Sequence, residues 1–343
     1  VLSMSRRFLL AMLPLVVALA LALVLALAPS PAGAQPAVFP DWLHPHVGTG
    51  EGQIAPIVLA RARALYQEKR RQGIVRNPCY LAMDATRPST MRNGQPGRDG
   101  QPGRRFYVIC ETARTFRAVS AGYGSGRTLP SADFSNERQC ARNFSNAEGS
   151  NLTMGGAYMT AETRTSFKGY YGESGQTRAF HRTFLLFDGE GETRNARERA
   201  IGGHPAMFVR WRCRLRSPDS PHADPDGYVP FGTLVNYTGG RSNGCTTWSG
   251  SASQDIISLV EGNPTSLYIY PESRDIDAVA GAVRSGIAPS EAGLSGAGLY
   301  WNSACLAAIG APKFWPKRTL QPVIDLWRQS LPEQPPFVLP ICQ

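Results

Sequence analysis

The segment GGRSNGCTTW at residues 239–248 contains two side chains that are able to act as nucleophiles, Ser242 and Cys245. Ser242 lies in a Gly-x-Ser-x-Gly pattern, which α/β-hydrolases use to place a serine on a sharp turn between a strand and a helix. Those enzymes also need an acid and then a histidine later in the chain, and no histidine follows His222. Residues 246–253 also lack the periodicity of a helix. Because the later histidine and the helix are both missing from the pattern, Cys245 is a better candidate for the nucleophile than Ser242.

Cys245 follows a glycine, so that its sulfur can lie where several backbone N–H groups converge. The amides of Asn243, Gly244 and Cys245 are the candidates to stabilise a thiolate and later the oxyanion of a tetrahedral intermediate. A cysteine nucleophile also needs a base that removes its proton and returns it to the leaving group. The chain has five histidines that could supply this base.

His204 is the strongest candidate for the base. It lies in a glycine-rich bend, IGGHPA at residues 201–206, just before a predicted strand, and such a bend exposes a side chain. His222 and His181 remain as alternative bases. No Cys-x-x-Cys pair occurs and the histidines do not cluster with cysteines at the spacing of metal ligands, so we predict neither a metal nor a cofactor.

With these residues identified, the chain resembles the L,D-transpeptidases, whose pattern is a histidine followed by Ser/Thr-His-Gly-Cys. It is most similar to the branch called murein L,D-transpeptidase catalytic-domain-like 2. The resemblance covers residues 80–270. Its motifs are, in chain order, YLAMDATRPS (80–89), residues 106–110, GYGSGR (122–127), residues 134–136, residues 148–150, MGGAY (154–158), residues 195–197, HPA (204–206) and GRS (240–242).

The resemblance implies a mainly β protein with an L,D-transpeptidase-like β-sandwich catalytic domain and flanking N- and C-terminal helices. Cys245 would attack an amide carbonyl of a peptidoglycan stem peptide, and an amine of a second stem would take the acyl group. His204 would act as base and then as acid. Arg241, Ser242 and Tyr158 are expected to line the substrate groove, and a carbapenem to acylate Cys245.

Three departures from the family pattern stand out. Asn243 replaces the usual histidine before Gly-Cys, and Pro205 stands where this branch commonly has glycine. The interval between His204 and Cys245 is longer than usual and contains SPDSPHADPD at residues 217–226. We expect this excursion to cap the groove and to change which stem amide is chosen.

The first residues are typical of an export signal. Arg6 and Arg7 precede an apolar run over residues 8–28, and Ala32-Gly-Ala34 is a suitable cleavage site. The apolar run is longer than usual for a cleaved signal, so an uncleaved membrane anchor stays open as an alternative. A cleaved signal and an uncleaved anchor both predict an exported, periplasmic or cell-envelope protein.

Seven cysteines in an exported chain suggest three disulfides and one leftover thiol. Six cysteines allow 15 connectivities. We expect Cys305 and Cys342, which share one C-terminal segment, to pair with each other.

The chain is basic, with 36 Lys and Arg against 26 Asp and Glu. Export makes nucleic acid an improbable partner, so we expect the charge either to meet an anionic polymer or membrane surface outside the cell or to serve solubility alone.

The remaining pattern predicts the elements that must position these residues. We expect a leader (1–34), a lead-in with a helix at 54–72 (35–78), a strand-rich catalytic domain (79–272) and a helical extension and tail packed on it (273–343). The glycine-rich tract at 94–103 is typical of an extended surface loop. The expected strands cover residues 80–84, 106–110, 116–120, 157–160, 183–187, 207–211, 233–237 and 266–270, and the expected C-terminal helices lie within 276–283, 300–309 and 320–329.

The sequence is also compatible with two other functions. The same Cys-His pair acting with water would make an L,D-carboxypeptidase. A non-catalytic wall-binding module would have Cys245 locked in a disulfide.

Overall fold

The computed structural model describes residues 39–93, 95–96, 101–287, 299–332 and 338–343, and residues 39–343 belong to one compact unit. The predicted leader lies outside the described residues. None of the helices in the described part of the chain is both long and apolar enough to cross a membrane. The described parts of the lead-in (39–78) and of the C-terminal extension (273–343) belong to the same compact unit as the sheet.

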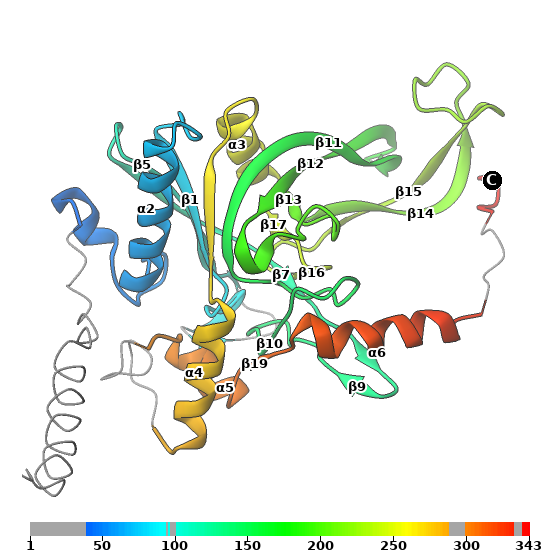
Figure 1. Cartoon of the computed structure of the whole chain (residues 1–343). Helices are drawn as coiled ribbons and strands as arrows, with labels where there is room; N and C mark the ends of the chain where they lie inside the picture. The colour runs from blue at the N-terminus through cyan, green and yellow to red at the C-terminus, as the bar shows by residue number, and fades with distance from the viewer. Residues whose placement is uncertain (1–38, 94, 97–100, 288–298, 333–337) are drawn as a thin grey trace, which may run out of the picture. The chain divides into compact units, whose positions relative to one another are not determined.

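The centre of the fold is a mixed ten-stranded sheet (Figure 1), which confirms a mainly β protein. Eight strands follow the order β17-β13-β12-β11-β18-β1-β5-β6, and β15, paired with β14, joins through β11. The strands are β1 (Cys79–Asp84), β5 (Arg104–Cys110), β6 (Thr115–Ser120), β11 (Gly156–Glu173), β12 (Gln176–Gly189), β13 (Gly202–Pro205), β14 (Met207–Arg216), β15 (Tyr228–Asn236), β17 (Thr246–Trp248) and β18 (Ser266–Tyr270).

Helices cover both faces of the sheet around β1. The helices are η1 (Asp41–His46), α2 (Pro56–Arg71), η2 (Gly191–Thr193), α3 (Gly250–Val260), α4 (Ser273–Arg284), α5 (Ser303–Ile309) and α6 (Lys317–Ser330). Side chains alternate along a strand, and β1 is buried throughout: Tyr80 packs in the cluster that includes α2, and Leu81 in the cluster that includes α3 and α4. Because β1 is buried on both faces, its sequence is a nearly continuous run of apolar residues rather than an alternating pattern.

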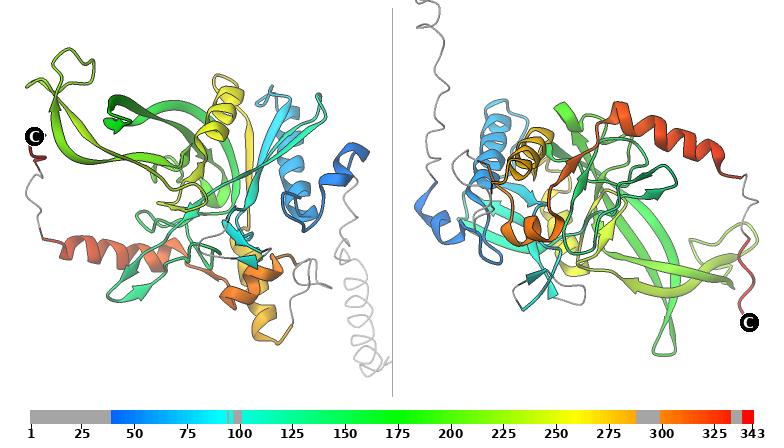
Figure 2. Two further views of the ribbon diagram at one scale, coloured as in Figure 1. Left: turned by 180° about the vertical axis from the view of Figure 1, so that it is seen from behind. Right: turned by 90° about the horizontal axis from the view of Figure 1, so that it is seen from below.

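Two long hairpins leave this covered region, β11 with β12 and β14 with β15 (Figure 2). Their strands extend well beyond the short apolar runs in the sequence, because their distal halves are largely exposed. Ser174 and Gly175 both have positive φ, as a tight two-residue hairpin turn requires.

Residues 217–227 join β14 to β15 at the outer end of that hairpin, away from Phe208 and Asn236 at its base. They line none of the pocket beside His204, so the expectation that this excursion caps the groove is wrong.

The structure differs from the sequence-based expectations at several short strands and at one helix. The tract at 94–103 is not only a loop, because β3 (Gln95–Pro96) and β4 (Gln101–Pro102) pair with β2 (Thr90–Arg92). Helix α3 starts five residues after Cys245, where the sequence showed no periodicity, and Ser249 caps it by accepting from the Ala252 N–H. The remaining short strands are β7 (Tyr123–Gly124) with β16 (Arg241–Ser242), β8 (Thr128–Leu129) with β9 (Ala132–Asp133), and β10 (Asn143–Phe144) with β19 (Lys313–Phe314).

Three disulfides link Cys79 to Cys110, Cys140 to Cys305, and Cys213 to Cys342. The expected Cys305–Cys342 pair is therefore wrong, because each of the two cysteines joins a distant part of the chain. Three disulfides indicate a chain that folds in an oxidising compartment outside the cytoplasm.

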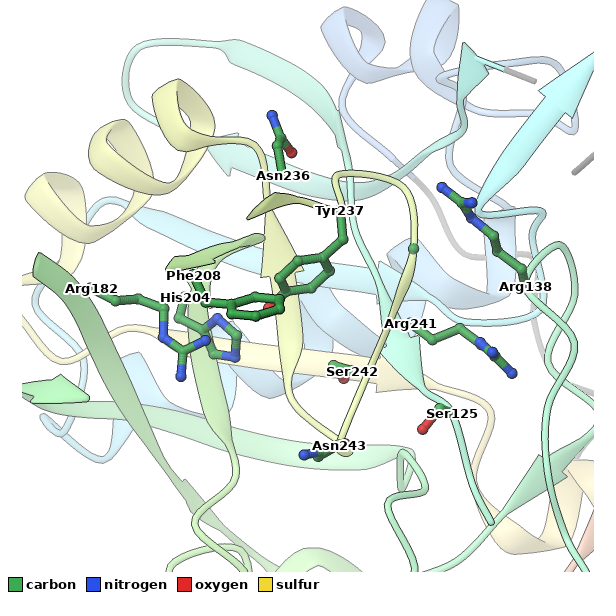
Figure 3. A pocket seen from close by; sticks show the side chains of 11 residues that line it. Ser125, Arg138, Arg182, His204, Phe208, Asn236, Tyr237, Arg241, Ser242 and Asn243 are labelled. Atoms are coloured by element: carbon green, nitrogen blue, oxygen red, sulfur yellow. The ribbon is translucent and has the colours of Figure 1, made fainter. Parts of the chain in front are cut away.

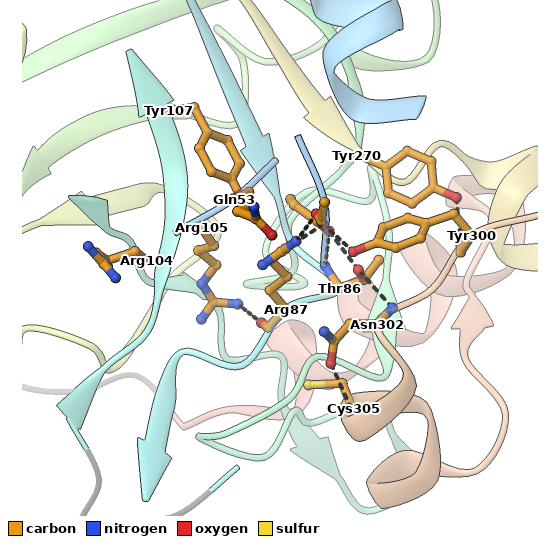
Figure 4. Close-up of polar contacts among 12 residues, drawn as sticks. Gln53, Thr86, Arg87, Arg104, Arg105, Tyr107, Tyr270, Tyr300, Asn302 and Cys305 are labelled. Carbon is orange, nitrogen blue, oxygen red and sulfur yellow. Dashed lines mark hydrogen bonds and ion pairs between the residues drawn. The ribbon is translucent and has the colours of Figure 1, made fainter. Parts of the chain in front are cut away.

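A buried polar cluster ties the lead-in and the C-terminal segment to the end of β1 (Figure 4). The carboxylate of Asp84, fully buried, accepts from the hydroxyls of Thr86 and Tyr300 and from Arg87. Arg87 also donates to the carbonyl oxygen of Gly50. A buried carboxylate needs such partners to offset its lost hydration, so these contacts fix the three segments to one another.

Candidate active site

Cys245 lies in a loop of residues 243–245 between β16 and β17, and it is the free cysteine among the described residues. The loop is held by Ser242, whose hydroxyl donates to the carbonyl oxygen of Cys245 and accepts from the Gly244 N–H at 3.2 Å. Ser242, which we expected to contact substrate, is buried and also borders the pocket described below. Its two hydrogen bonds explain why a serine stands three residues before the cysteine.

Gly244 has φ +108°, a backbone conformation that residues with a side chain rarely adopt. A Cβ added there would lie 3.1 Å from the carbonyl oxygen of Leu152 and from Cδ1 of Ile201. Because its N–H already donates to Ser242, Gly244 is not a free oxyanion donor. The N–H groups of Asn243 and Cys245, by contrast, donate to no other residue in the part of the chain that the structure describes.

The sulfur of Cys245 packs against the segment that leads into β13. Its thiol donates to the carbonyl oxygen of Ala200 at 3.5 Å. Burial raises the pKa of the Cys245 thiol, and the Gly202 amide and the charges of Arg182 and Arg199 counter only part of this effect. Cys245 is therefore a neutral thiol at pH 7.

His204 lies on β13, which pairs in parallel with β17: Gly203 lies opposite Thr246, and His204 opposite Thr247. Side chains of residues two apart on a strand point to the same face. Continued by one residue before β17, this register places Cys245 opposite Gly202. Cys245 is then two residues before Thr247, the partner of His204, and lies on the same face of the sheet as His204. The structure thus brings the two predicted residues to one small region.

The imidazole of His204 is buried, stacks on Phe184 and places Nδ1 2.9 Å from the carbonyl oxygen of Pro205. In this contact Nδ1 carries the hydrogen and donates, which leaves Nε2 with a lone pair that can accept a proton. Burial, followed by the positive charge of Arg182, lowers the pKa of His204 to about 4. The imidazole is therefore neutral at pH 7, as a general base must be.

His204 borders a pocket of about 680 Å³ (Figure 3). Figure 3 shows Arg182 beside the imidazole, Arg241 near Ser125 on the other side of the pocket, and Arg138 above Arg241 on that same side. Its lining is Ser125, Arg138, Arg182, His204, Phe208, Asn236, Tyr237, Gly240, Arg241, Ser242 and Asn243. Cys245, two residues after the lining residue Asn243, is 8% exposed and does not itself line the pocket.

Other predicted residues lie elsewhere. Tyr158 is buried, its hydroxyl donates to the carbonyl oxygen of Met154 at 2.7 Å, and it does not line the pocket, contrary to expectation. The rings of His181 and His222 contact each other with centroids 4.2 Å apart, and neither lines the pocket of His204. His204 is thus the one of the three candidate bases that borders this pocket.

Arg138, Arg182 and Tyr237 were missed by sequence reasoning. Arg182 comes from the long β12 strand and Arg138 from a loop, and no spacing relates either residue to Cys245. Tyr237 lies close before the glycine-rich segment that begins at Gly239, and that proximity was the only available signal.

The chain was compared with protein-family models, with curated proteins and with solved structures, and no match was found in any of the three. Its function must therefore be argued from the site itself. Within the described residues, no three His, Cys, Asp or Glu side chains are grouped so as to hold a metal ion.

Proposed function

We propose that this chain is a peptidoglycan L,D-transpeptidase of the periplasm or cell envelope that forms stem-peptide cross-links through an acyl-enzyme on Cys245. One observation carries the proposal: the cysteine left free by three disulfides packs against the segment leading to His204, whose pocket is open to a ligand. The resemblance of residues 80–270 to that family supports it.

The reaction begins with the neutral thiol and the neutral imidazole. The thiol turns from Ala200 toward His204, and Nε2 accepts its proton as the sulfur attacks an amide carbonyl of the donor stem. The amides of Asn243 and Cys245 donate to the oxyanion that forms. His204 then protonates the leaving amine, the carbon–nitrogen bond breaks, and a thioester remains on Cys245.

The second half repeats these steps in reverse. The amine of a neighbouring stem peptide enters, gives its proton to His204 and attacks the thioester carbonyl. The thiolate leaves and regains its proton from the imidazole. The product is a new amide, which is the cross-link, and water in place of the amine makes the L,D-carboxypeptidase reaction.

The proposal is tested by muropeptide analysis of cells that express the full chain or its variants. We expect new cross-linked dimers with the wild-type chain and none with Cys245→Ala or His204→Ala. His222→Ala is the matched control, because that histidine lies outside the pocket, and dimers should form as in the wild type. Trimmed monomers without new dimers would identify a carboxypeptidase instead.

A second experiment examines the thiol directly. Intact mass spectrometry of the folded, unreduced protein after incubation with a carbapenem should show one adduct, mapped to Cys245. An unmodified mass would contradict an acylatable cysteine. A disulfide on Cys245, found by peptide mapping, would instead favour a non-catalytic wall-binding module.

A further inference from the structure

The turn at residues 194–200, which precedes β13, brings a charged side chain to the Cys245 loop. Arg199 is partly buried, and its Nη2 donates to the carbonyl oxygen of Leu152 at 2.6 Å. The same Nη2 lies 3.7 Å from the position that a Cβ on Gly244 would take. Because Gly244 directly precedes Cys245, the guanidinium of Arg199 lies against the loop that carries the sulfur.

Arg199 lacks an acidic partner. In the part of the chain that the structure describes, its guanidinium forms no ion pair with an Asp or Glu side chain. The acid whose charge acts on it, Glu148, is paired with Arg328. A carbonyl oxygen carries only a partial charge, so the contact with Leu152 does not replace the hydration that burial removes from a cation. Burial accordingly lowers the pKa of Arg199.

Two neighbouring side chains would give Arg199 a counter-ion if they ionised, namely Tyr158 and Cys245. Burial raises the pKa of Tyr158 well above its ordinary value, and its hydroxyl donates to the carbonyl oxygen of Met154, so Tyr158 stays neutral. Cys245, in contrast, gives its proton to His204 in the proposed reaction. The thiolate is therefore the counter-ion that Arg199 lacks in the resting protein.

The same turn also binds the neutral form of the thiol. Ala200 follows Arg199 in the chain, and its carbonyl oxygen accepts from the thiol of Cys245 at 3.5 Å. A thiolate cannot donate this hydrogen bond, because it and the carbonyl oxygen are both acceptors. Two consecutive residues thus offer Cys245 an acceptor that suits the thiol and a cation that suits the thiolate.

We propose that Arg199 is a positioning residue that acts as the counter-ion of the Cys245 thiolate. When Nε2 of His204 accepts the proton, the electron pair of the S–H bond stays on the sulfur. Arg199 stabilises that negative charge until the pair forms the bond to the acyl carbon. The catalytic part of this inference rests on the proposed function, whereas the effect of Arg199 on the ionisation of the sulfur does not.

The other titratable groups around the sulfur make Arg199 the residue to change. Arg182 and Arg199 are the two cations whose charge acts on the thiol. The hydroxyls of Tyr158 and Tyr237 face it as well, and burial raises the pKa of both. The charge that lowers the pKa of His204 is that of Arg182. A substitution of Arg199 therefore alters the thiolate without removing the charge that acts on the imidazole.

The test measures the rate at which iodoacetamide alkylates Cys245 in the full chain from pH 6 to 10, by mass spectrometry. Arg199→Gln and Arg199→Met both remove the charge and keep a long side chain, so one folded variant of the two is enough. A nearby opposite charge shifts a pKa by about one to three units, and a thiolate of higher pKa is partly compensated by its greater nucleophilicity. Together these effects predict alkylation about fivefold or more slower than wild type at pH 8.

Two further variants separate charge from structure. Arg199→Lys keeps a positive charge and should react within about twofold of the wild type. Arg197→Gln is the matched control, because Arg197 belongs to the same turn but pairs with Glu162 and Asp188 at the surface, and it should react as the wild type does. Loss of the Leu152 contact alone would loosen the loop and expose the sulfur, so a purely structural effect would speed alkylation.

The outcomes separate this inference from the proposed function. Slow alkylation of the neutral variants with nearly wild-type alkylation of Arg199→Lys supports the inference. An unchanged or faster reaction of the neutral variants, or an Arg199→Lys variant as slow as they are, overturns it. Alkylation needs no stem peptide: new cross-links without an effect of Arg199 on alkylation would leave the proposed function standing alone. An effect of Arg199 without cross-links supports the counter-ion and contradicts the transpeptidase.

Discussion

The thiol of Cys245 donates to the carbonyl oxygen of Ala200, four residues before His204 in the chain. Burial raises the pKa of this thiol, and the hydrogen bond to Ala200 is one that a neutral thiol donates. Cys245 and His204 are thus both buried and neutral at pH 7, and the proposed reaction requires the thiol to rotate toward the imidazole before a proton moves. The resting state should therefore be weakly reactive toward small electrophiles.

We expect iodoacetamide to alkylate Cys245 slowly at pH 7, with a rate that still rises above pH 9. Burial raises the pKa of this thiol, so its thiolate fraction is smaller at every pH than that of an ordinary cysteine. The rate is measured from pH 6 to 10 by mass spectrometry. The urea-unfolded chain is the control and should titrate near the usual pKa of about 8.5. A folded-state midpoint below pH 7 would contradict the neutral resting thiol.

His204 should make the folded protein less stable in acid. Its pKa is about 4 when folded and about 6.5 when unfolded. Between these values the unfolded chain binds a proton that the folded chain does not, so stability falls as the pH drops from about 6.5 to 4. The loss is on the order of 3 kcal/mol.

Urea unfolding across this pH window measures the effect. His204→Gln removes the titrating group and should flatten that part of the stability curve. Arg182→Gln removes a positive charge and should raise the pKa of His204, as followed by NMR of the imidazole. If the pKa of His204 stays near 4 in Arg182→Gln, the charge of Arg182 does not act on the imidazole.

Ser242→Ala should loosen the loop that carries Cys245. It removes a buried hydroxyl that joins the Gly244 N–H to the Cys245 carbonyl, at a cost of about 1–2 kcal/mol. We expect a slower acylation of Cys245 as well. Ser249→Ala is the control, since it removes the cap of α3 at a cost of about 1 kcal/mol and should leave acylation unchanged. Equal acylation rates in the two variants would assign Ser242 no positioning role.

Gly244→Ala should distort the same loop by sterics. The positive φ is strained for alanine by about 1–3 kcal/mol, and the new Cβ meets the Leu152 carbonyl oxygen at 3.1 Å. Gly175→Ala is the matched control, because Gly175 also has a positive φ but has nothing within 4 Å of an added Cβ. Both variants should lose stability in urea, and only Gly244→Ala should change the alkylation rate of Cys245.

Parts of the fold were predictable because local patterns reflect burial. β1, β5 and β18 are short apolar runs that are buried in the sheet, and their predicted positions are confirmed. The helices α2 and α4 are amphipathic and lie where the periodicity placed them. The outer halves of β11 and β12 were missed because much of their length is exposed, which leaves polar residues with no apolar alternation to detect.

The sequence by itself determined the chemistry available, namely one glycine-flanked cysteine, few histidines, and an even set of cysteines left for disulfides. Only the tertiary structure decided which cysteines pair, that His204 rather than His181 or His222 borders the pocket next to the Cys245 loop, and that Arg138, Arg182 and Arg241 gather around that pocket. The reason is physical: strand register and disulfide connectivity join residues far apart in the chain, and no local spacing encodes those contacts.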